Sequence, residues 1–239
     1  MNPRNRVIVA LDVPTEAQAR AIVGALGETA QHYKIGLQLL TAAGPALLRE
    51  LIDAGREVFL DLKLFEIPNS VAGAVRAAGE QGVSMVTVHA SAGSAILRAA
   101  VEAARPWPAL KALALTVVTS LRDADLREVG IDAGTDAQVL RLARLAQAAC
   151  CHGVVASAHE AAMLRDALDA RLLRVTPGIQ LAGEGGSDQA RAATPAQAIR
   201  AGATHIVLGR SITRAADPRA AFAAVCDELG TAAGHPHYC

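Results

Sequence analysis

The sequence predicts an α/β fold, a (β/α)8 barrel that forms a single domain over residues 1–230. Three observations support it: eight short apolar runs, eight helical patterns in strict alternation with them, and polar residues where the runs end. A closed barrel is the simplest architecture that uses all of these elements. A doubly wound open sheet is the alternative, and residues 231–239 are expected to be a flexible C-terminal tail.

The apolar runs are the predicted strands. In chain order they cover residues 6–12, 32–37, 57–63, 83–90, 110–118, 152–157, 172–178 and 205–211. Each is short and rich in Val, Ile and Leu, as "RVIVALD" and "EVFLDLK" illustrate. Runs this apolar are typical of parallel strands that are covered on both faces.

The segments between the runs are the predicted helices. In chain order they cover residues 15–27, 44–55, 69–82, 94–104, 136–149, 159–168, 194–202 and 217–230. The first two end on a glycine, which is a common helix stop. The last begins with Asp217 as N-cap and Pro218 as its first residue.

Composition excludes several classes of protein. The chain carries 23 basic and 23 acidic residues, so it lacks the basic excess of a nucleic-acid-binding protein. No apolar run is long enough to span a membrane, and the N-terminus lacks a signal-peptide pattern, so a cytoplasmic protein is expected. The four cysteines are expected to be reduced thiols, and "CCHG" at 150–153 lacks the ligand spacing of a zinc site.

Polar side chains lie at or just after the C-terminal ends of the predicted strands. They are Asp12, Lys34, Asp61, Lys63, His89, Thr119, Ser157 and Arg210. Solvated loops are also polar, so one such residue alone would carry little weight. Because active sites of (β/α)8 barrels occupy the C-terminal ends of the strands, eight together predict a site there.

The densest charge lies in "DLKLFEIPNS", residues 61–70. Alternation along a strand predicts that Asp61 and Lys63 point to the same side, and Lys34 ends the neighbouring strand. Glu66 follows three residues later. The cluster is either a structural ion-pair network or a site where an ammonium stabilises developing negative charge. Spacing leaves both interpretations open.

This stretch resembles the Asp-x-Lys-x-x-Asp-Ile-Pro-x-Thr signature of the orotidine 5′-phosphate decarboxylase family, in its bacterial form. The resemblance extends along nearly the whole chain. In order, the other similar segments are "VIVALDV", "YKIGLQL", "VTVHASAG", "ALTVVTS", "GVVASAHE", "RVTPGIQ", "SDQARAATP" and "IVLGRSIT".

The resemblance implies decarboxylation of orotidine 5′-monophosphate to uridine 5′-monophosphate and CO₂, the last step of UMP biosynthesis, without a cofactor or metal. It implies that Lys63 stabilises the C6 carbanion and then donates the proton, beside Asp61 and Lys34. It also implies a homodimer in which Glu66 completes the catalytic array across the interface.

The same resemblance gives the substrate-binding residues. They are Asp12, Lys34, Asp61, Ile67, Pro68, Ser70, Thr119, Ser120, Pro177, Gln180, Gln189, Gly209 and Arg210. Asp12 matches a ribose-binding carboxylate, and Thr119 and Ser120 match the pair that contacts the pyrimidine edge. Gln189 and Arg210 match the phosphate-binding residues. The Gly-rich segment 180–189 suits a loop that closes over a ligand.

The sequence departs from the family pattern at four positions. Glu66 stands where the family has Asp, Phe65 where bacterial members usually have His, Ser70 for Thr, and Gln180 for a common Arg. Glu66 therefore has an alternative interpretation as an interface ion pair. Two alternatives to the whole assignment follow: a Mg²⁺-dependent phosphosugar decarboxylase with a related motif, and a phosphate-ligand-binding barrel without activity.

Overall fold

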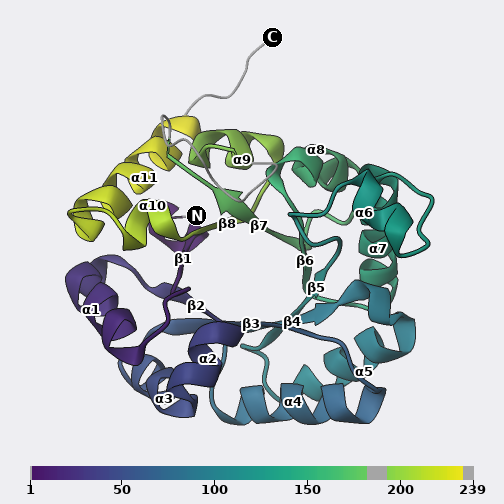
Figure 1. Cartoon of the computed structure of the whole chain (residues 1–239), viewed down its shortest axis with the longest axis horizontal. Helices are drawn as coiled ribbons and strands as arrows, with labels where there is room; N and C mark the ends of the chain where they lie inside the picture. The colour runs from purple at the N-terminus through teal and green to yellow at the C-terminus, as the bar shows by residue number, and fades with distance from the viewer. Residues whose placement is uncertain (1, 182–192, 234–239) are drawn as a thin grey trace.

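Eight parallel strands close into a barrel in the structure, a computed structural model that describes residues 2–181 and 193–233. The strands pair in sequence order, and β8 pairs with β1. Figure 1 shows the ring of strands with the helices arranged around it. The predicted (β/α)8 barrel is confirmed, and the open-sheet alternative is wrong.

The strands lie where the apolar runs predict them. They are β1 Val7–Ala10, β2 His32–Gly36, β3 Glu57–Leu64, β4 Met85–His89, β5 Lys111–Leu115, β6 Gly153–Val155, β7 Leu173–Ile179 and β8 His205–Leu208. Most are shorter than the apolar runs that contain them, because the runs include loop residues that pack on the core. The polar ends of the runs therefore lie at the mouth of the barrel.

Eight helices match the predicted segments. They are α1 Glu16–Leu26, α3 Pro45–Asp53, α4 Pro68–Glu80, α5 Ser94–Ala104, α7 Thr135–Ala148, α8 Ala158–Ala167, α9 Pro195–Ala201 and α11 Pro218–Ala233. The Asp217 carboxylate accepts a hydrogen bond from the Ala220 N–H at 3.0 Å, which confirms the predicted N-cap of α11. This helix continues past residue 230, and residues 234–239 of the expected tail lie outside the described residues.

Several short helices were not predicted. They are α2 Leu37–Ala43, α6 Asp123–Glu128, α10 Arg210–Thr213, and the 3-10 turns η1 Pro3–Arg6, η2 Gly27–Thr29 and η3 Ala90–Ala92. The three α-helices follow β2, β5 and β8, so they lie in loops on the C-terminal face of the barrel.

Side-chain alternation along the strands produces two hydrophobic layers. The inner layer fills the barrel with Ile8, Ala10, Phe59, Met85, Leu113, Leu115, Val155, Val175 and Val207. The outer layer packs the other strand face against the helices, and Tyr33, Ile35 and Phe222 are fully or almost fully buried there. Burial of apolar side chains on both faces is what parallel strands require. The inner layer gives way to polar side chains toward the C-terminal ends of the strands.

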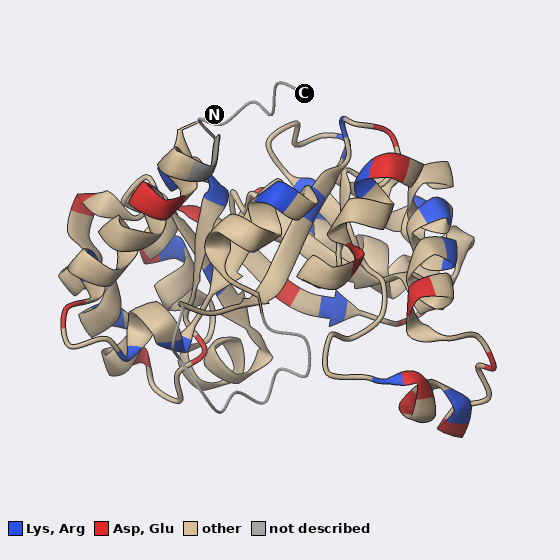
Figure 2. Cartoon of the chain, turned by 90° about the horizontal axis from the view of Figure 1, so that it is seen from above, with Lys and Arg blue, Asp and Glu red and all other residues tan. Residues whose placement is uncertain are grey.

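The outside of the molecule has mixed charge. Figure 2 shows Lys and Arg interspersed with Asp and Glu rather than gathered into one patch, in keeping with 23 residues of each kind. Within the described part of the chain, none of the helices has the length and hydropathy that a membrane span requires. Cys150, Cys151 and Cys226, the cysteines in that part, are free thiols, as predicted.

Candidate active site

A cavity of about 1120 Å³ opens at the C-terminal ends of the strands. Residues on β1, β2, β3, β5, β6, β7 and β8, or just after them, line it. Ten of the predicted site residues are among them: Asp12, Lys34, Asp61, Lys63, Thr119, Ser120, Pro177, Gln180, Gly209 and Arg210. The fold thus brings together residues that are almost 200 positions apart in the sequence.

Four charged side chains alternate in sign along one wall of this cavity. Asp61 Oδ2 lies 2.8 Å from Lys63 Nζ and 3.7 Å from Lys34 Nζ. Lys34 Nζ also lies 2.8 Å from Asp12 Oδ1. The Lys34 side chain is 9% exposed and the Lys63 side chain 38%, so Lys63 carries the more accessible ammonium.

The backbone at Lys63 has an unusual conformation. Its φ is 50°, in the left-handed region, which costs a residue with a side chain about 1–2 kcal/mol. The pairing of β3 with β4 shifts register between Leu60 and Leu64 at the same point. Asp61 and Lys63 do converge as predicted, but strand alternation alone is not the reason. The irregular backbone aims the Lys63 side chain.

Thr87 on β4 supports this cluster and was not predicted. Its side chain is fully buried. Its hydroxyl accepts a hydrogen bond from the Lys63 N–H at 2.8 Å and donates one to Asp61 Oδ1 at 2.9 Å. A sequence signal did exist, because Thr87 shares the inward register of Met85 and is polar within the apolar run "MVTVH".

His89 closes β4 at the rim of the site. Burial, and then the nearby Lys63 ammonium, lower the pKa of His89 below its ordinary value, which favours the neutral ring at pH 7. The ring stacks on Phe65 with centroids 5.5 Å apart, and its Nδ1 accepts a hydrogen bond from the Ser91 N–H at 3.3 Å. These contacts are those of a structural residue that fixes the loops beside the cavity.

The part of the cavity at the end of β8 holds two of the residues predicted to bind substrate. Gly209 ends β8 and Arg210 begins α10, and both line the cavity. Arg214, one turn further on, also lines it and was not predicted. Gln189 lies outside the described residues, as does most of the Gly-rich segment expected to close over a ligand.

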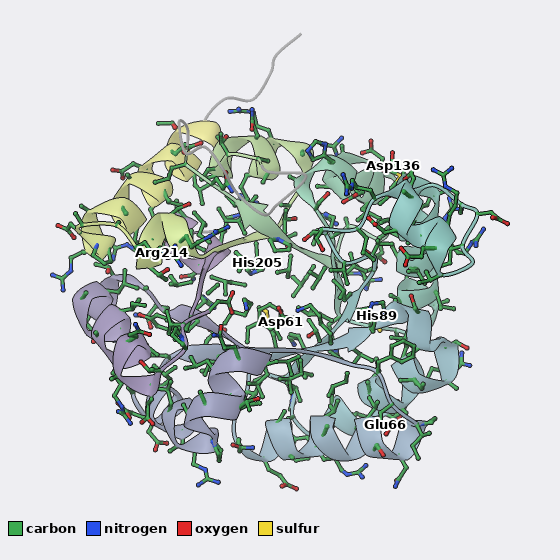
Figure 3. All side chains as sticks on the ribbon, viewed as in Figure 1. Asp61, Glu66, His89, Asp136, His205 and Arg214 are labelled. Atoms are coloured by element: carbon green, nitrogen blue, oxygen red, sulfur yellow. The ribbon has the colours of Figure 1, made fainter. Side chains whose placement is uncertain are left out.

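The residues that follow β3 do not join this cavity within one chain. Glu66, Ile67, Pro68 and Ser70 are exposed and are not among the residues that line it. The Glu66 carboxylate accepts a hydrogen bond from the Ile67 N–H at 2.6 Å. In Figure 3 Asp61 lies inside the ring of strands, whereas Glu66 lies outside it, beside the helical layer. A single chain therefore holds Lys34, Asp61 and Lys63 together without Glu66.

Metal-ligand geometry is not found in the described part of the chain, where no group of three His, Cys, Asp or Glu side chains is arranged to hold an ion. That finding includes the sequence neighbours Cys150, Cys151 and His152. Four cationic side chains line the cavity: Lys34, Lys63, Arg210 and Arg214.

Comparison with known proteins assigns the family. Residues 5–225 match the model of the orotidine 5′-phosphate decarboxylase / HUMPS family. The chain is 47% identical to orotidine 5′-phosphate decarboxylase from Anaeromyxobacter dehalogenans, over 96% of this chain and 100% of the relative. It is 48% identical to the protein of that name from Halorhodospira halophila, over 95% and 97%.

Solved structures give the same answer. The crystal structure of orotidine 5′-phosphate decarboxylase from Lactobacillus acidophilus matches with a TM-score of 0.84 and 35% identity, over 93% of this chain and 98% of that one. Together with the barrel and the charged cluster at its mouth, these matches show that the chain belongs to the orotidine 5′-phosphate decarboxylase / HUMPS family.

Proposed function

We propose that this chain decarboxylates orotidine 5′-monophosphate to uridine 5′-monophosphate and CO₂ without a cofactor, as the last step of UMP biosynthesis. The observation that carries the proposal is the Lys63 ammonium held 2.8 Å from Asp61 in a cavity at the barrel mouth. The nearly full-length similarity to proteins named for this activity supports it. A cytoplasmic homodimer is part of the proposal.

The reaction breaks the bond between C6 and the carboxylate and leaves the electron pair on C6. An ammonium placed beside that carbon stabilises the developing negative charge, since a preorganised charge needs no reorganisation during the reaction. Lys63 then donates a proton to C6 and regains one from solvent. Its side-chain exposure of 38% means that its amine can reach a ligand in the cavity.

Asp61 has two roles in this proposal. It would lie beside the substrate carboxylate, where two unit charges 4 Å apart repel by about 4 kcal/mol at an effective dielectric of 20. Departure of CO₂ relieves that repulsion. Its ion pair with Lys63 also holds the ammonium in place before the substrate binds.

The remaining cavity residues would hold the nucleotide. Asp12, just after β1, and Lys34, on β2, form an ion pair that suits ribose hydroxyls. Thr119 and Ser120 would contact the pyrimidine edge. Arg210 would bind phosphate oxygens with its planar guanidinium, which matches that geometry better than an ammonium does.

We infer that Glu66, with Ile67 and Ser70, acts in the cavity of a partner subunit. Glu66 is exposed and lies away from its own cavity. The large apolar side chains beside it, Phe65 and Ile67, are 64% and 61% exposed. Burial of these side chains in a homodimer would remove them from water, which is favourable.

Mixing two inactive variants tests the shared site. Lys63→Ala and Glu66→Ala homodimers should each have little activity. After subunit exchange, a mixture should recover part of the wild-type rate, because one of the two sites in a hybrid dimer is intact. Mass spectrometry of isotope-labelled chains confirms the exchange. No recovery despite confirmed exchange would assign Glu66 to an ion pair without a catalytic role.

The metal-free assay separates the proposal from its two alternatives. Purified enzyme in EDTA should convert orotidine 5′-monophosphate, followed by the loss of its ultraviolet absorbance. Activity that disappears with EDTA and returns with Mg²⁺ would favour a phosphosugar decarboxylase. Binding of uridine 5′-monophosphate without any turnover would favour a binding barrel that has lost activity.

A further inference from the structure

One side chain outside the cavity joins both residues of the proposed reaction centre. Thr87 is fully buried on β4, and it is not among the residues that line the cavity. Its hydroxyl is nevertheless hydrogen-bonded to Lys63 and Asp61, at 2.8 Å and 2.9 Å. Thr87 therefore contacts Lys63 and Asp61 from the buried side of the cavity wall, where it has no access to a ligand.

The direction of these two hydrogen bonds is fixed by chemistry. The Lys63 backbone N–H can only donate, so the Thr87 oxygen accepts. The Thr87 proton is then left for Asp61 Oδ1. With Oδ1 held in this way, Asp61 presents Oδ2 to Lys63 Nζ at 2.8 Å and to Lys34 Nζ at 3.7 Å. Rotation of the carboxylate would break a charge-assisted hydrogen bond, which is roughly twice as strong as a neutral one.

The same hydroxyl supports the strained backbone of Lys63. Ladder pairing between β3 and β4 shifts register between Leu60 and Leu64. Within that interval the Lys63 N–H bonds to the Thr87 side chain, and Lys63 has its φ of 50°. A buried N–H without a partner costs about 1–3 kcal/mol, so this hydrogen bond helps to maintain the unusual conformation.

We propose that Thr87 is a positioning residue: its hydroxyl fixes both the Asp61 carboxylate and the backbone that aims the Lys63 ammonium. The inference rests on the proposed function, because it assigns Lys63 to the reacting carbon. Thr87 itself contacts neither substrate nor product. Its removal should therefore slow the chemical step and leave nucleotide binding nearly unchanged.

The test compares Thr87→Val, Thr87→Ser and a control, Thr116→Val. Valine has the shape of threonine without its hydroxyl, and serine keeps the hydroxyl. Thr116 is also fully buried, and its hydroxyl donates to the Val155 carbonyl at 2.9 Å, but it does not line the cavity. Both valine variants remove a buried threonine hydroxyl, so they should lose similar thermal stability.

We expect kcat of Thr87→Val to fall at least about tenfold with little change in KM, the pattern of an interaction needed in the transition state. Thr87→Ser should keep most of the wild-type kcat, and Thr116→Val should match the wild type. The dissociation constant for uridine 5′-monophosphate, measured by calorimetry, should stay within about twofold in Thr87→Val, since a tenfold change would need about 1.4 kcal/mol. If Thr87→Val does not fold, Thr87→Ala is compared with Thr116→Ala in the same way.

A wild-type kcat in Thr87→Val, or an equal loss of kcat in Thr116→Val, would overturn the inference. A loss of uridine 5′-monophosphate affinity as large as the loss of kcat would also overturn it, because general damage to the cavity would then explain the effect. An inactive wild-type enzyme would refute the proposed function instead. The two failures are therefore distinguishable.

Discussion

The two lysines of the charged cluster are not equivalent. Lys34 lies between two carboxylates, Asp12 and Asp61, at 2.8 Å and 3.7 Å, and its side chain is 9% exposed. Lys63 pairs with Asp61 alone among the described carboxylates and is 38% exposed. An ammonium shared by two carboxylates is held in place, whereas one with a single partner can move toward a ligand. This asymmetry favours Lys63 as the residue that meets the reacting carbon.

Replacing Arg210 tests the phosphate end of the cavity. Arg210→Ala should raise KM at least about tenfold, because a hydrogen bond to a charged group contributes about 1.5–3 kcal/mol, and should lower kcat much less. Arg200→Ala on α9 removes the same charge from a residue that does not line the cavity, so its KM should be unchanged. Steady-state kinetics of both variants makes the comparison. Equal KM values in the two variants would show that Arg210 does not bind the phosphate.

The sequence predicted the charged residues of the site but not Thr87. Asp12, Lys34, Asp61 and Lys63 were predictable because charge at the end of a buried strand is rare without a reason. Thr87 was missed although it is polar at an inward position of β4, because threonine is common in strands and its contacts depend on a register shift in β3 that no local pattern encodes. Its contacts exist only once two strands are paired.

Among the helices and strands, α4 is the one whose packing most directly affects the loop that carries Glu66. This helix begins at Pro68, directly after the loop that carries Glu66. Gly79, near its C-terminal end, lies against Trp107, and an added Cβ would come within 2.4 Å of the indole Cδ2. The absence of a side chain at Gly79 therefore lets Trp107 pack on α4, which anchors the helix behind the loop.

Gly79→Ala should destabilise the protein by about 1–3 kcal/mol, the usual cost of overpacking. Gly24→Ala is the matched control, because Gly24 lies in α1 with nothing within 4 Å of an added Cβ. That variant should gain up to about 1 kcal/mol from improved helix propensity. Urea denaturation measures both free energies of unfolding. An unchanged value for Gly79→Ala would mean that Trp107 moves aside without cost.

Elements of different length were predicted with different success. The strands and the longer helices show sustained apolar periodicity, which survives in the fold because it reflects burial. The missed α6 and α10 have six and four residues, so they span too few turns for a periodic signal. The missed α2 has seven residues, as does the predicted α9, but α9 is marked in the sequence by Thr194 and Pro195 at its start and Gly202 at its end. Such short helices form because the surrounding barrel fixes their ends, and tertiary contacts rather than propensity stabilise them.

The two ends of the barrel have different chemistry. The C-terminal end carries the proposed site, and the N-terminal end buries His32 on β2 and His205 on β8. Burial first, then His32 and Arg6, lower the pKa of His205 to about 4. The pKa of His32 is also lowered by burial, partly offset by Glu57, whose Oε2 lies 3.4 Å from its Nδ1. Both rings are therefore neutral in the folded protein at pH 7.

This arrangement predicts a loss of stability in mild acid. Below pH 6.5, the ordinary pKa of histidine, the unfolded chain gains a proton at His205 that the folded chain does not take up until about pH 4. The free energy of unfolding should therefore fall by up to about 3 kcal/mol across that window because of His205 alone. His205→Gln, which cannot titrate, should show a shallower decline in urea denaturation at pH 7, 6, 5 and 4. Identical slopes for wild type and variant would refute the assignment.

The whole molecule could be predicted well from sequence because one regular pattern, repeated eight times, has one simple closed solution. The assembly could not, because a dimer interface has no periodic signature in the chain. Glu66 shows the difference: its place after β3 was predictable, but the partner surface that it meets depends on a second copy.

Lys63 provides the decisive experiment. The turnover of orotidine 5′-monophosphate is measured in EDTA for the wild type and for Lys63→Ala, with circular dichroism and uridine 5′-monophosphate binding to establish that the variant is folded. We expect rapid turnover by the wild type and no turnover above background by the variant, because the amine paired with Asp61 at 2.8 Å has been removed. A folded, ligand-binding Lys63→Ala enzyme that still releases CO₂ at a substantial rate would show that another group carries the chemistry.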